Sequence, residues 1–176
     1  IMPRLFVGFP APSMVPLELQ RKFASYDLTP SKEFHLTLKF LGEVGDSRIP
    51  EIIQRLHKVQ ASMPTFSFSH LGSFPDLDGK PRVLWVALQP EEPLQELHEL
   101  VEEALAGLFP REFDYKPHIT LGRFRSDKNI SVLPSVLKMT PPHFTFLVKE
   151  LCLYKSEQRP DDTSAHIVLT KIPLQS

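Results

Sequence analysis

The chain has 176 residues, of which 41% are hydrophobic and 23% are charged, and its formal net charge is −1. This composition is typical of a globular protein of one domain and excludes a disordered chain. No apolar run approaches the roughly 18 residues that a membrane-spanning helix needs. The near-neutral charge argues against a protein that coats a long nucleic acid through its phosphates, since such proteins carry a large basic excess.

The compartment expected from the sequence is a reducing cytoplasm. Cys152 is the only cysteine, so no disulfide can form within the chain. It lies in a strand-like apolar run, which favours a small buried side chain over a nucleophile. Pro3, Pro10 and Pro12 interrupt the N-terminal segment, which therefore lacks the pattern of a secretory signal peptide.

The first half of the chain contains both strand and helix patterns. Strand-type residues bounded by turn residues predict strands at 4–9, 35–41 and 65–69. Apolar residues at helical spacing predict helices at 14–26 and 49–59. The stretch Asp76-Leu77-Asp78-Gly79 is typical of a turn, because the later ligands of a calcium loop do not follow it.

The second half repeats this order. A strand is predicted at 82–88, an amphipathic helix at 94–108 and a further strand at 118–124. A proline-interrupted segment runs to about residue 137. Two more strands, 144–154 and 165–172, are joined by the polar loop 155–164.

Each half therefore runs strand, proline-rich turn, helix, strand. The two repeats span roughly 4–73 and 82–172, and no linker separates them. Repetition of this kind predicts a duplicated α+β unit with a pseudo-twofold axis. We expect residues 1–176 to form a single two-lobed domain.

The second strand predicted in each repeat carries the same tetrapeptide. His35-Leu36-Thr37-Leu38 occurs in the first half and His118-Ile119-Thr120-Leu121 in the second. Residues i and i+2 of a strand share a face, so each copy presents an imidazole and a hydroxyl together and turns two apolar residues to the core. With seven histidines in the chain, chance would produce this pattern far less than once.

Two imidazoles and two hydroxyls in one cleft suit the cleavage of a phosphodiester. An imidazole titrates near about 6.5, so one ring can accept a proton from water while the other donates a proton to the leaving oxygen. Threonine hydroxyls can donate hydrogen bonds to the non-bridging phosphate oxygens. A cyclic phosphodiester fits best, because its alkoxide leaving group needs an acid.

The paired motifs and their neighbours resemble the 2H phosphoesterase superfamily, and within it the LigT-like bacterial RNA 2′,3′-cyclic phosphodiesterases, formerly called 2′-5′ RNA ligases. The resemblance covers nearly the whole chain and also rests on Arg4-Leu5-Phe6-Val7-Gly8, Lys39-Phe40-Leu41-Gly42-Glu43-Val44 and Lys116-Pro117. It implies a bilobal α+β fold in which two antiparallel sheets line a central cleft and the helices lie outside.

The resemblance also implies a reaction and a set of site residues. The expected reaction is metal-independent opening of a 2′,3′-cyclic phosphate at an RNA 3′ end, or on a small nucleotide, to leave a 2′-phosphate. We assign His35 as the proton donor and His118 as the proton acceptor, although the near symmetry of the motifs makes this assignment reversible. Thr37 and Thr120 are the expected phosphate ligands. No cofactor and no metal is expected, and the protein is expected to act as a monomer away from membranes.

Arg123 stands where this family often carries a phosphate-binding arginine. Strict alternation places Arg123 on the face opposite His118, but Gly122 can host a bulge that redirects its side chain. The matching residue after His35 is Phe40, an aromatic residue that could flank a base but that we expect in the core.

Other polar residues are weaker candidates. The basic residues at strand ends and loops could contact further RNA phosphates, although each of them fits plain surface better; they are Arg125, Lys128, Lys155 and Arg159. His166-Ile167-Val168-Leu169 resembles a third motif but has valine in place of threonine, so we interpret it as a decoy. His57 and His98 are expected to be ordinary helical residues.

Three rival functions stay open or are disfavoured. A zinc site usually needs three or four ligands, and neither motif has a Cys, Asp or Glu at ligand spacing. A non-catalytic module that binds RNA ends or nucleotides stays open, although it needs no acid–base pair. A 2′-5′ RNA ligase that joins tRNA halves would use the same site in reverse, without a phosphate-binding loop for ATP.

Overall fold

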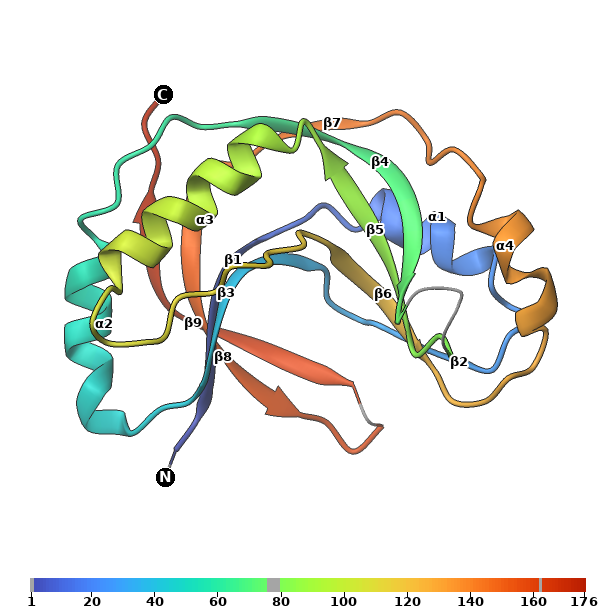
Figure 1. The fold of residues 1–176 in the computed structure, drawn as a ribbon, viewed down its shortest axis with the longest axis horizontal. Helices are drawn as coiled ribbons and strands as arrows, with labels where there is room; N and C mark the ends of the chain where they lie inside the picture. Colours follow the sequence, from blue (N-terminus) through green and yellow to red (C-terminus); the bar gives the residue numbers. More distant parts are fainter. Residues whose placement is uncertain (1, 76–79, 162) are drawn as a thin grey trace.

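The computed structural model describes residues 2–75, 80–161 and 163–176. Within these ranges the strands form one curled antiparallel sheet of nine strands, in the order β7-β4-β5-β6-β3-β1-β8-β9, with β2 paired to β6 (Figure 1). The strands are β1 (Arg4–Pro10), β2 (Leu28–Pro30), β3 (His35–Glu43), β4 (Thr65–Phe74), β5 (Val83–Gln89), β6 (Ile119–Phe124), β7 (Thr145–Leu147), β8 (Glu150–Gln158) and β9 (Ser164–Pro173). The α-helices are α1 (Met14–Arg21), α2 (Ile49–Leu56), α3 (Glu92–Ala104) and α4 (Leu133–Val136). The predicted α+β class is confirmed.

The two predicted sheets are joined at one point. Strands β3, β1, β8 and β9 form one lobe, and β6, β2, β5, β4 and β7 form the other. The lobes meet where β3 and β6 pair through Leu36 and Ile119. Both residues occupy the second position of their tetrapeptide, so the pseudo-twofold relation of the repeats runs through this pair.

The helices cross over between the repeats. Helix α3, from the second repeat, packs against β3 of the first, and α1 from the first repeat packs against β6 of the second. Figure 1 shows α2 and α3 beside one lobe and α1 and α4 beside the other. Each repeat therefore covers a strand of the other, and the main core cluster contains residues of both lobes.

The sheet has one face that is covered and one that is open. Strand β1 turns Leu5, Val7 and Phe9 into the main core, where they are almost fully buried. The intervening Phe6 points to the other face, where it forms a small separate cluster with Cys152 and Tyr154. This alternation is the expected consequence of a two-residue strand period. The open face carries the polar residues of the motifs.

The structure corrects some predicted boundaries. The helix predicted at 14–26 ends at Arg21, and a short strand, β2, follows it. The strand predicted at 144–154 is two strands, β7 and β8, and residues 155–158 of the predicted loop 155–164 still belong to β8. The turn predicted at 76–79 lies outside the described residues. No helix in the described part of the chain is long and apolar enough to cross a membrane.

Candidate active site

The register of the sheet brings the two tetrapeptides together. Leu36 pairs with Ile119 in antiparallel register. Continuing that register places His35 opposite Thr120 and Thr37 opposite His118. Residues that stand opposite each other on antiparallel strands share a face. Each histidine therefore faces the threonine of the other copy, a pairing that no local sequence pattern predicts.

Both tetrapeptides also carry an irregularity at their fourth residue. The pairing of β1 with β3 skips Leu38, and the pairing of β5 with β6 skips Leu121. Such bulges bend a strand and redirect the side chains that follow. A side chain from the crossed-over helix satisfies each bulged carbonyl: His98 Nδ1 donates to Leu38 O at 2.7 Å, and Gln20 Nε2 donates to Leu121 O at 2.8 Å.

His35 is enclosed by aromatic rings. Its ring centroid lies 4.7 Å from that of Phe6 and 4.2 Å from that of His166, which packs edge-on. Tyr154 is 6.0 Å away. The Nδ1 atom of His35 is buried and has no hydrogen-bond partner among the described residues. The remaining ring edge is thus the part of His35 that is available to the pocket.

His118 has different surroundings. Its Nδ1 lies 2.8 Å from the backbone oxygen of Lys116, so this nitrogen carries the hydrogen and donates it. The ring packs edge-on against Phe74 at 4.7 Å and lies 6.3 Å from Trp85. A Cβ on Gly72 would lie 2.2 Å from the indole ring, so only glycine leaves room for Trp85 beside His118.

The two environments affect proton binding differently. Burial, followed by the positive charges of His166 and His118, lowers the pKa of His35 to about 3. Burial also lowers the pKa of His118, but the hydrogen bond to the Lys116 carbonyl acts in the opposite direction and favours the protonated ring. In the absence of substrate, His35 is therefore neutral at neutral pH.

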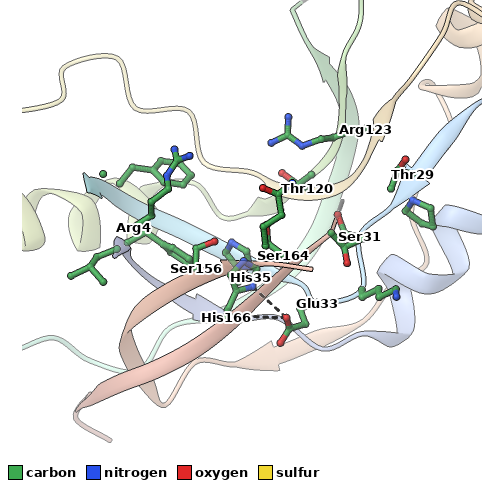
Figure 2. A pocket seen from close by; sticks show the side chains of 18 residues that line it. Arg4, Thr29, Ser31, Glu33, His35, Thr120, Arg123, Ser156, Ser164 and His166 are labelled. Atoms are coloured by element: carbon green, nitrogen blue, oxygen red, sulfur yellow. Dashed lines mark hydrogen bonds and ion pairs between the residues drawn. The ribbon is translucent and has the colours of Figure 1, made fainter. Parts of the chain in front are cut away.

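A pocket of about 380 Å³ opens beside His35 (Figure 2). Thr120 and Arg123 line it together with His35. The remaining lining comes from the start of β1, from β2 and the segment that follows it, from the end of β3, and from the β8–β9 hairpin. These residues are Arg4, Leu5, Phe6, Thr29, Pro30, Ser31, Lys32, Glu33, Phe40, Gly42, Ser156, Gln158, Thr163, Ser164 and His166. Thr37 and His118 do not line this pocket, although the charge of His118 acts on His35.

Arg123 lies at the same pocket as Thr120 (Figure 2). The irregularity in β6 falls between Thr120 and Gly122, one residue before the predicted position. A Cβ on Gly122 would lie 2.7 Å from the backbone oxygen of Thr29, so the glycine allows β2 to pack closely there.

Phe40, at the matching place in the first copy, does not lie in the core as predicted. It is 65% exposed and lines the pocket. The pairing of β1 with β3 skips both Leu38 and Leu41, so strict alternation is broken on either side of Phe40. The prediction for this residue was wrong because it assumed a regular strand.

His166 was interpreted as a decoy, yet the structure places it in the pocket beside His35. Strand β9 pairs with β8, where His166 stands opposite Ser156, and both residues line the pocket. The incomplete third motif was a signal in the sequence, but only the pairing of β9, β8 and β1 brings it to His35.

Most of the predicted RNA-contacting cations have acidic partners. Arg125 pairs with Asp27 at 3.2 Å, Lys155 with Glu157 at 3.4 Å, and Arg159 with Glu33 at 3.1 Å. These pairs make plain surface or hairpin roles the better interpretation. Arg4 and Arg123 line the pocket, and among the described residues no ion pair involves either of them.

One group of side chains has the composition of a metal site. The ligand atoms of His98, Glu102 and Glu112 lie within 4.8 Å of one another. However, the buried Lys39 ammonium already binds Glu102 at 2.6 Å, and the Glu112 backbone N–H donates to the same carboxylate at 2.7 Å. Tyr115 stacks on His98 at 4.0 Å and donates to the carbonyl of Thr37 at 2.8 Å. We interpret this cluster as a brace behind the first motif.

The comparisons with known proteins agree with this geometry. The model of the 2′-5′ RNA ligase superfamily matches residues 16–160. An Archaeoglobus fulgidus protein named RNA 2′,3′-cyclic phosphodiesterase is 39% identical over 114 residues, which cover 64% of each chain, so this chain matches less than two-thirds of that relative. A Methanocaldococcus jannaschii protein of the same name is 30% identical over 166 residues, which cover 90% of this chain and 94% of that one.

Solved structures show the same fold. TT0787 of Thermus thermophilus superposes with a TM-score of 0.76 at 26% identity, over 98% of both chains. Escherichia coli LigT complexed with 3′-AMP superposes with a TM-score of 0.78 at 24% identity, over the full length of both chains. With the family model matching most of the chain, and with both tetrapeptides meeting at the centre of the sheet, the chain belongs to the 2′-5′ RNA ligase superfamily, the 2H phosphoesterases.

Proposed function

We propose that the chain is an RNA 2′,3′-cyclic phosphodiesterase that opens a 2′,3′-cyclic phosphate at an RNA 3′ end, or on a small nucleotide, to give a 2′-phosphate. The observation that carries this proposal is the pairing of Leu36 with Ile119, which sets each histidine across from the threonine of the other motif. Relatives named RNA 2′,3′-cyclic phosphodiesterase support the substrate class.

In the proposed reaction one histidine removes a proton from water, whose oxygen attacks the phosphorus. The bond from phosphorus to the 3′ oxygen breaks, and the other histidine donates a proton to that oxygen. The step is balanced by water alone, so the proposal includes no metal or cofactor. Each histidine is left in the protonation state of the other and must exchange its proton with solvent before the next turnover.

The roles of the two histidines follow from their surroundings. The sequence suggested His35 as the donor and His118 as the acceptor, with motifs that could work in either direction. In the free protein burial lowers the pKa of both rings, but the charges of His166 and His118 lower that of His35 further, whereas the hydrogen bond to the Lys116 carbonyl favours the protonated form of His118. These features support the opposite order, so we propose His118 as the donor and His35 as the acceptor.

The proposed phosphate ligands are Thr37, Thr120 and Arg123. Hydroxyl and guanidinium donors aimed at the non-bridging oxygens stabilise the charge that develops there in the transition state. Thr120 and Arg123 line the pocket next to His35, which supports their place in this set. Thr37 is proposed from the motif symmetry.

The test is incubation of the purified protein with 2′,3′-cyclic-phosphate substrates of one, two and many nucleotides, in the presence of a chelator. We expect conversion to 2′-phosphate products at an undiminished rate with the chelator. Binding without any product would favour a non-catalytic module that recognises RNA ends. Formation of a 2′-5′ bond between tRNA halves, in excess over hydrolysis, would favour a ligase. Activity that returns only with added metal would overturn the proposed mechanism.

We also keep as predictions that the protein acts as a monomer in the cytoplasm. The buried Cys152 is compatible with a reducing environment, since burial raises the pKa of its thiol and leaves it protonated and unreactive. Sedimentation of the purified protein would test the oligomeric state.

A further inference from the structure

The residue of interest is His166, which the two-histidine mechanism does not use. It lies on β9, and its side chain is only 11% exposed although it lines the pocket. Its ring centroid is 4.2 Å from that of His35, in an edge-on arrangement with an interplanar angle of 74°. Phe6 contacts both rings, at 4.7 Å for His35 and 5.2 Å for His166. The His35 ring is thus packed between Phe6 and His166.

His166 is held from behind by a carboxylate. Its backbone N–H donates to Glu33 Oε2 at 3.1 Å, and its ring Nδ1 lies 3.7 Å from the same oxygen. Figure 2 shows these contacts between His166 and Glu33, on the side of the imidazole away from Thr120 and Arg123. An imidazole with one nitrogen turned towards a carboxylate is fixed in orientation, as are metal-bound or catalytic histidines with such a partner.

Glu33 is itself fixed by the tip of the β8–β9 hairpin. Arg159 donates to Glu33 Oε2 at 3.1 Å and to the backbone oxygen of Ser164 at 3.1 Å. Lys32, the neighbour of Glu33, pairs with Asp161 in the same hairpin. The segment that leads into β3 and His35 is therefore tied to the hairpin that carries His166, and this tie lies at the wall of the pocket.

We propose that His166 is a positioning residue for the proposed reaction: Glu33 holds its ring, which fixes the His35 ring and places a second titratable charge beside it. The inference rests on the proposed function, in which His35 accepts the proton of water. It concerns His166 of this chain, whose tetrapeptide lacks the threonine of the other two.

The charge next to His35 has a defined direction of effect. When His166 is protonated, its charge opposes a second charge on His35 and lowers the pKa of that ring. The groups that face His166 are Glu33, Arg159, His35 and the phenol of Tyr154. Burial, the largest influence, and the Arg159 charge lower the pKa of His166, while Glu33 raises it. Burial raises the pKa of Tyr154, so that group stays neutral.

A proton acceptor must be neutral, so the rate falls when the pH drops through its pKa. Removing the His166 charge raises the pKa of His35, and the acid limb of the pH–rate profile should then move to higher pH. Removing the whole ring also lets His35 tilt away from its working position. A loss of placement by about 1 Å can cost roughly a hundredfold in rate without weakening substrate binding.

Two substitutions separate these effects. His166→Phe keeps a ring against His35 and removes the charge, whereas His166→Ala removes both. We expect the acid limb to move to higher pH in both variants and kcat to fall about ten- to hundredfold in His166→Ala, with less loss in His166→Phe. KM should change little in either variant. The matched control is His57→Ala. His57 is an exposed histidine whose ring contacts Thr170, a residue of β9 like His166, but it lies away from the pocket.

A second measurement does not depend on turnover. The imidazole nitrogens of His35 are followed by NMR as a function of pH in the substrate-free protein, in wild type and in His166→Phe. We expect His35 to titrate at a higher pH in the variant, whether or not the wild type hydrolyses a cyclic phosphate. Failure of the proposed function and failure of this inference are therefore distinguishable.

The inference is overturned if His35 titrates identically in wild type and His166→Phe, or if both variants keep the wild-type kcat and pH profile. An increase in KM with an unchanged kcat would instead mean that His166 contacts the substrate and does not act through His35. Because His166→Phe keeps an aromatic ring beside His35, it keeps the inference testable even if His166→Ala fails to fold.

Discussion

The half-site around His35 and the half-site around His118 have the same local backbone arrangement, but different side chains surround the two histidines. Each has its motif on a strand, a bulge at the fourth residue and a carbonyl that accepts from the helix of the other repeat. Around His35, however, the neighbours are Phe6 and a second histidine. His118 instead has an indole and a phenyl ring beside it, and it donates to a carbonyl.

The difference teaches how a duplicated unit can divide the work of one reaction. Two equal histidines would bind protons equally, and neither would be favoured as acid or base. Here the pairing of the strands supplies the symmetry, which sets each ring across from the threonine of the other copy. The side chains behind each ring break that symmetry and set different proton affinities, which is what an acid–base pair requires.

The largest expected effect comes from removing either imidazole. His35→Ala and His118→Ala should each lower kcat by about 10²–10⁴-fold, because each deletes one partner of the proton transfer. His57→Ala is the control, since that histidine is exposed at the C-terminal end of α2 and does not line the pocket. The pH–rate profile of the wild type should be bell-shaped. Either alanine variant with unimpaired hydrolysis would contradict the pairing of the two half-sites.

The hydroxyls test whether the symmetry extends to the phosphate ligands. Thr37→Val and Thr120→Val preserve the branched shape and the strand preference but delete one donor each. Loss of one donor to the developing charge costs about 3 kcal/mol, or roughly a hundredfold in rate. We expect the loss in kcat, with melting temperatures near wild type. If both variants keep wild-type rates, the threonines serve only the packing of the strands.

Arg123 tests a difference between the two half-sites at the pocket, because the matching residue in the first copy is the uncharged Phe40. Arg123→Gln should lower kcat/KM by about ten- to hundredfold, because a hydrogen bond to a charged group is lost. The control is Arg125→Gln, since Arg125 lies on the same segment but pairs with Asp27. Equal kinetics for the two variants would show that Arg123 does not bind the phosphate.

Substitution of the two side chains that donate to the bulge carbonyls tests what stabilises the backbone arrangement that both half-sites have. His98→Leu leaves the Leu38 carbonyl without its side-chain donor, which costs about 1–3 kcal/mol in the free energy of unfolding. Gln20→Leu should cost less, because the Leu121 carbonyl still accepts from the backbone N–H of Ser31 at 2.9 Å. Urea unfolding measures this loss, with the exposed Gln95→Leu on α3 as control. We expect the larger effect for His98, which is buried and also stacks on Tyr115. No loss in either variant would mean that the bulges form without these donors.

The effect that is smallest at neutral pH, and that grows in acid, is a dependence of stability on pH that belongs to His35. In the unfolded chain this residue binds a proton near its ordinary pKa of about 6.5, but in the folded protein only near about 3. Between these values the unfolded state binds more protons, so lowering the pH destabilises the fold. We expect the unfolding free energy to fall less steeply with acid in His35→Gln than in wild type. Identical slopes would show that His35 is not held neutral by its surroundings.

Local patterns in the sequence predicted a large part of the protein. A two-residue alternation placed His35 and Thr37 on one face and Leu36 and Leu38 on the other, and the structure has the leucines fully buried. The repeated order of strands and helices predicted the two lobes. These features depend on residues close together in the chain, whose spacing fixes which side chains share a face.

Only the tertiary structure decided how the halves meet. The register of β3 against β6 sets His35 opposite Thr120, and the crossed helices supply the donors for both bulges. The same long-range pairing carries His166 to His35, pairs Arg159 with Glu33, and leaves Phe40 exposed beside a bulge. Contacts of this kind join residues far apart in sequence, and their register depends on how whole strands pack. For that reason the two motifs could be predicted from the sequence, while the surroundings of each histidine depend on tertiary contacts.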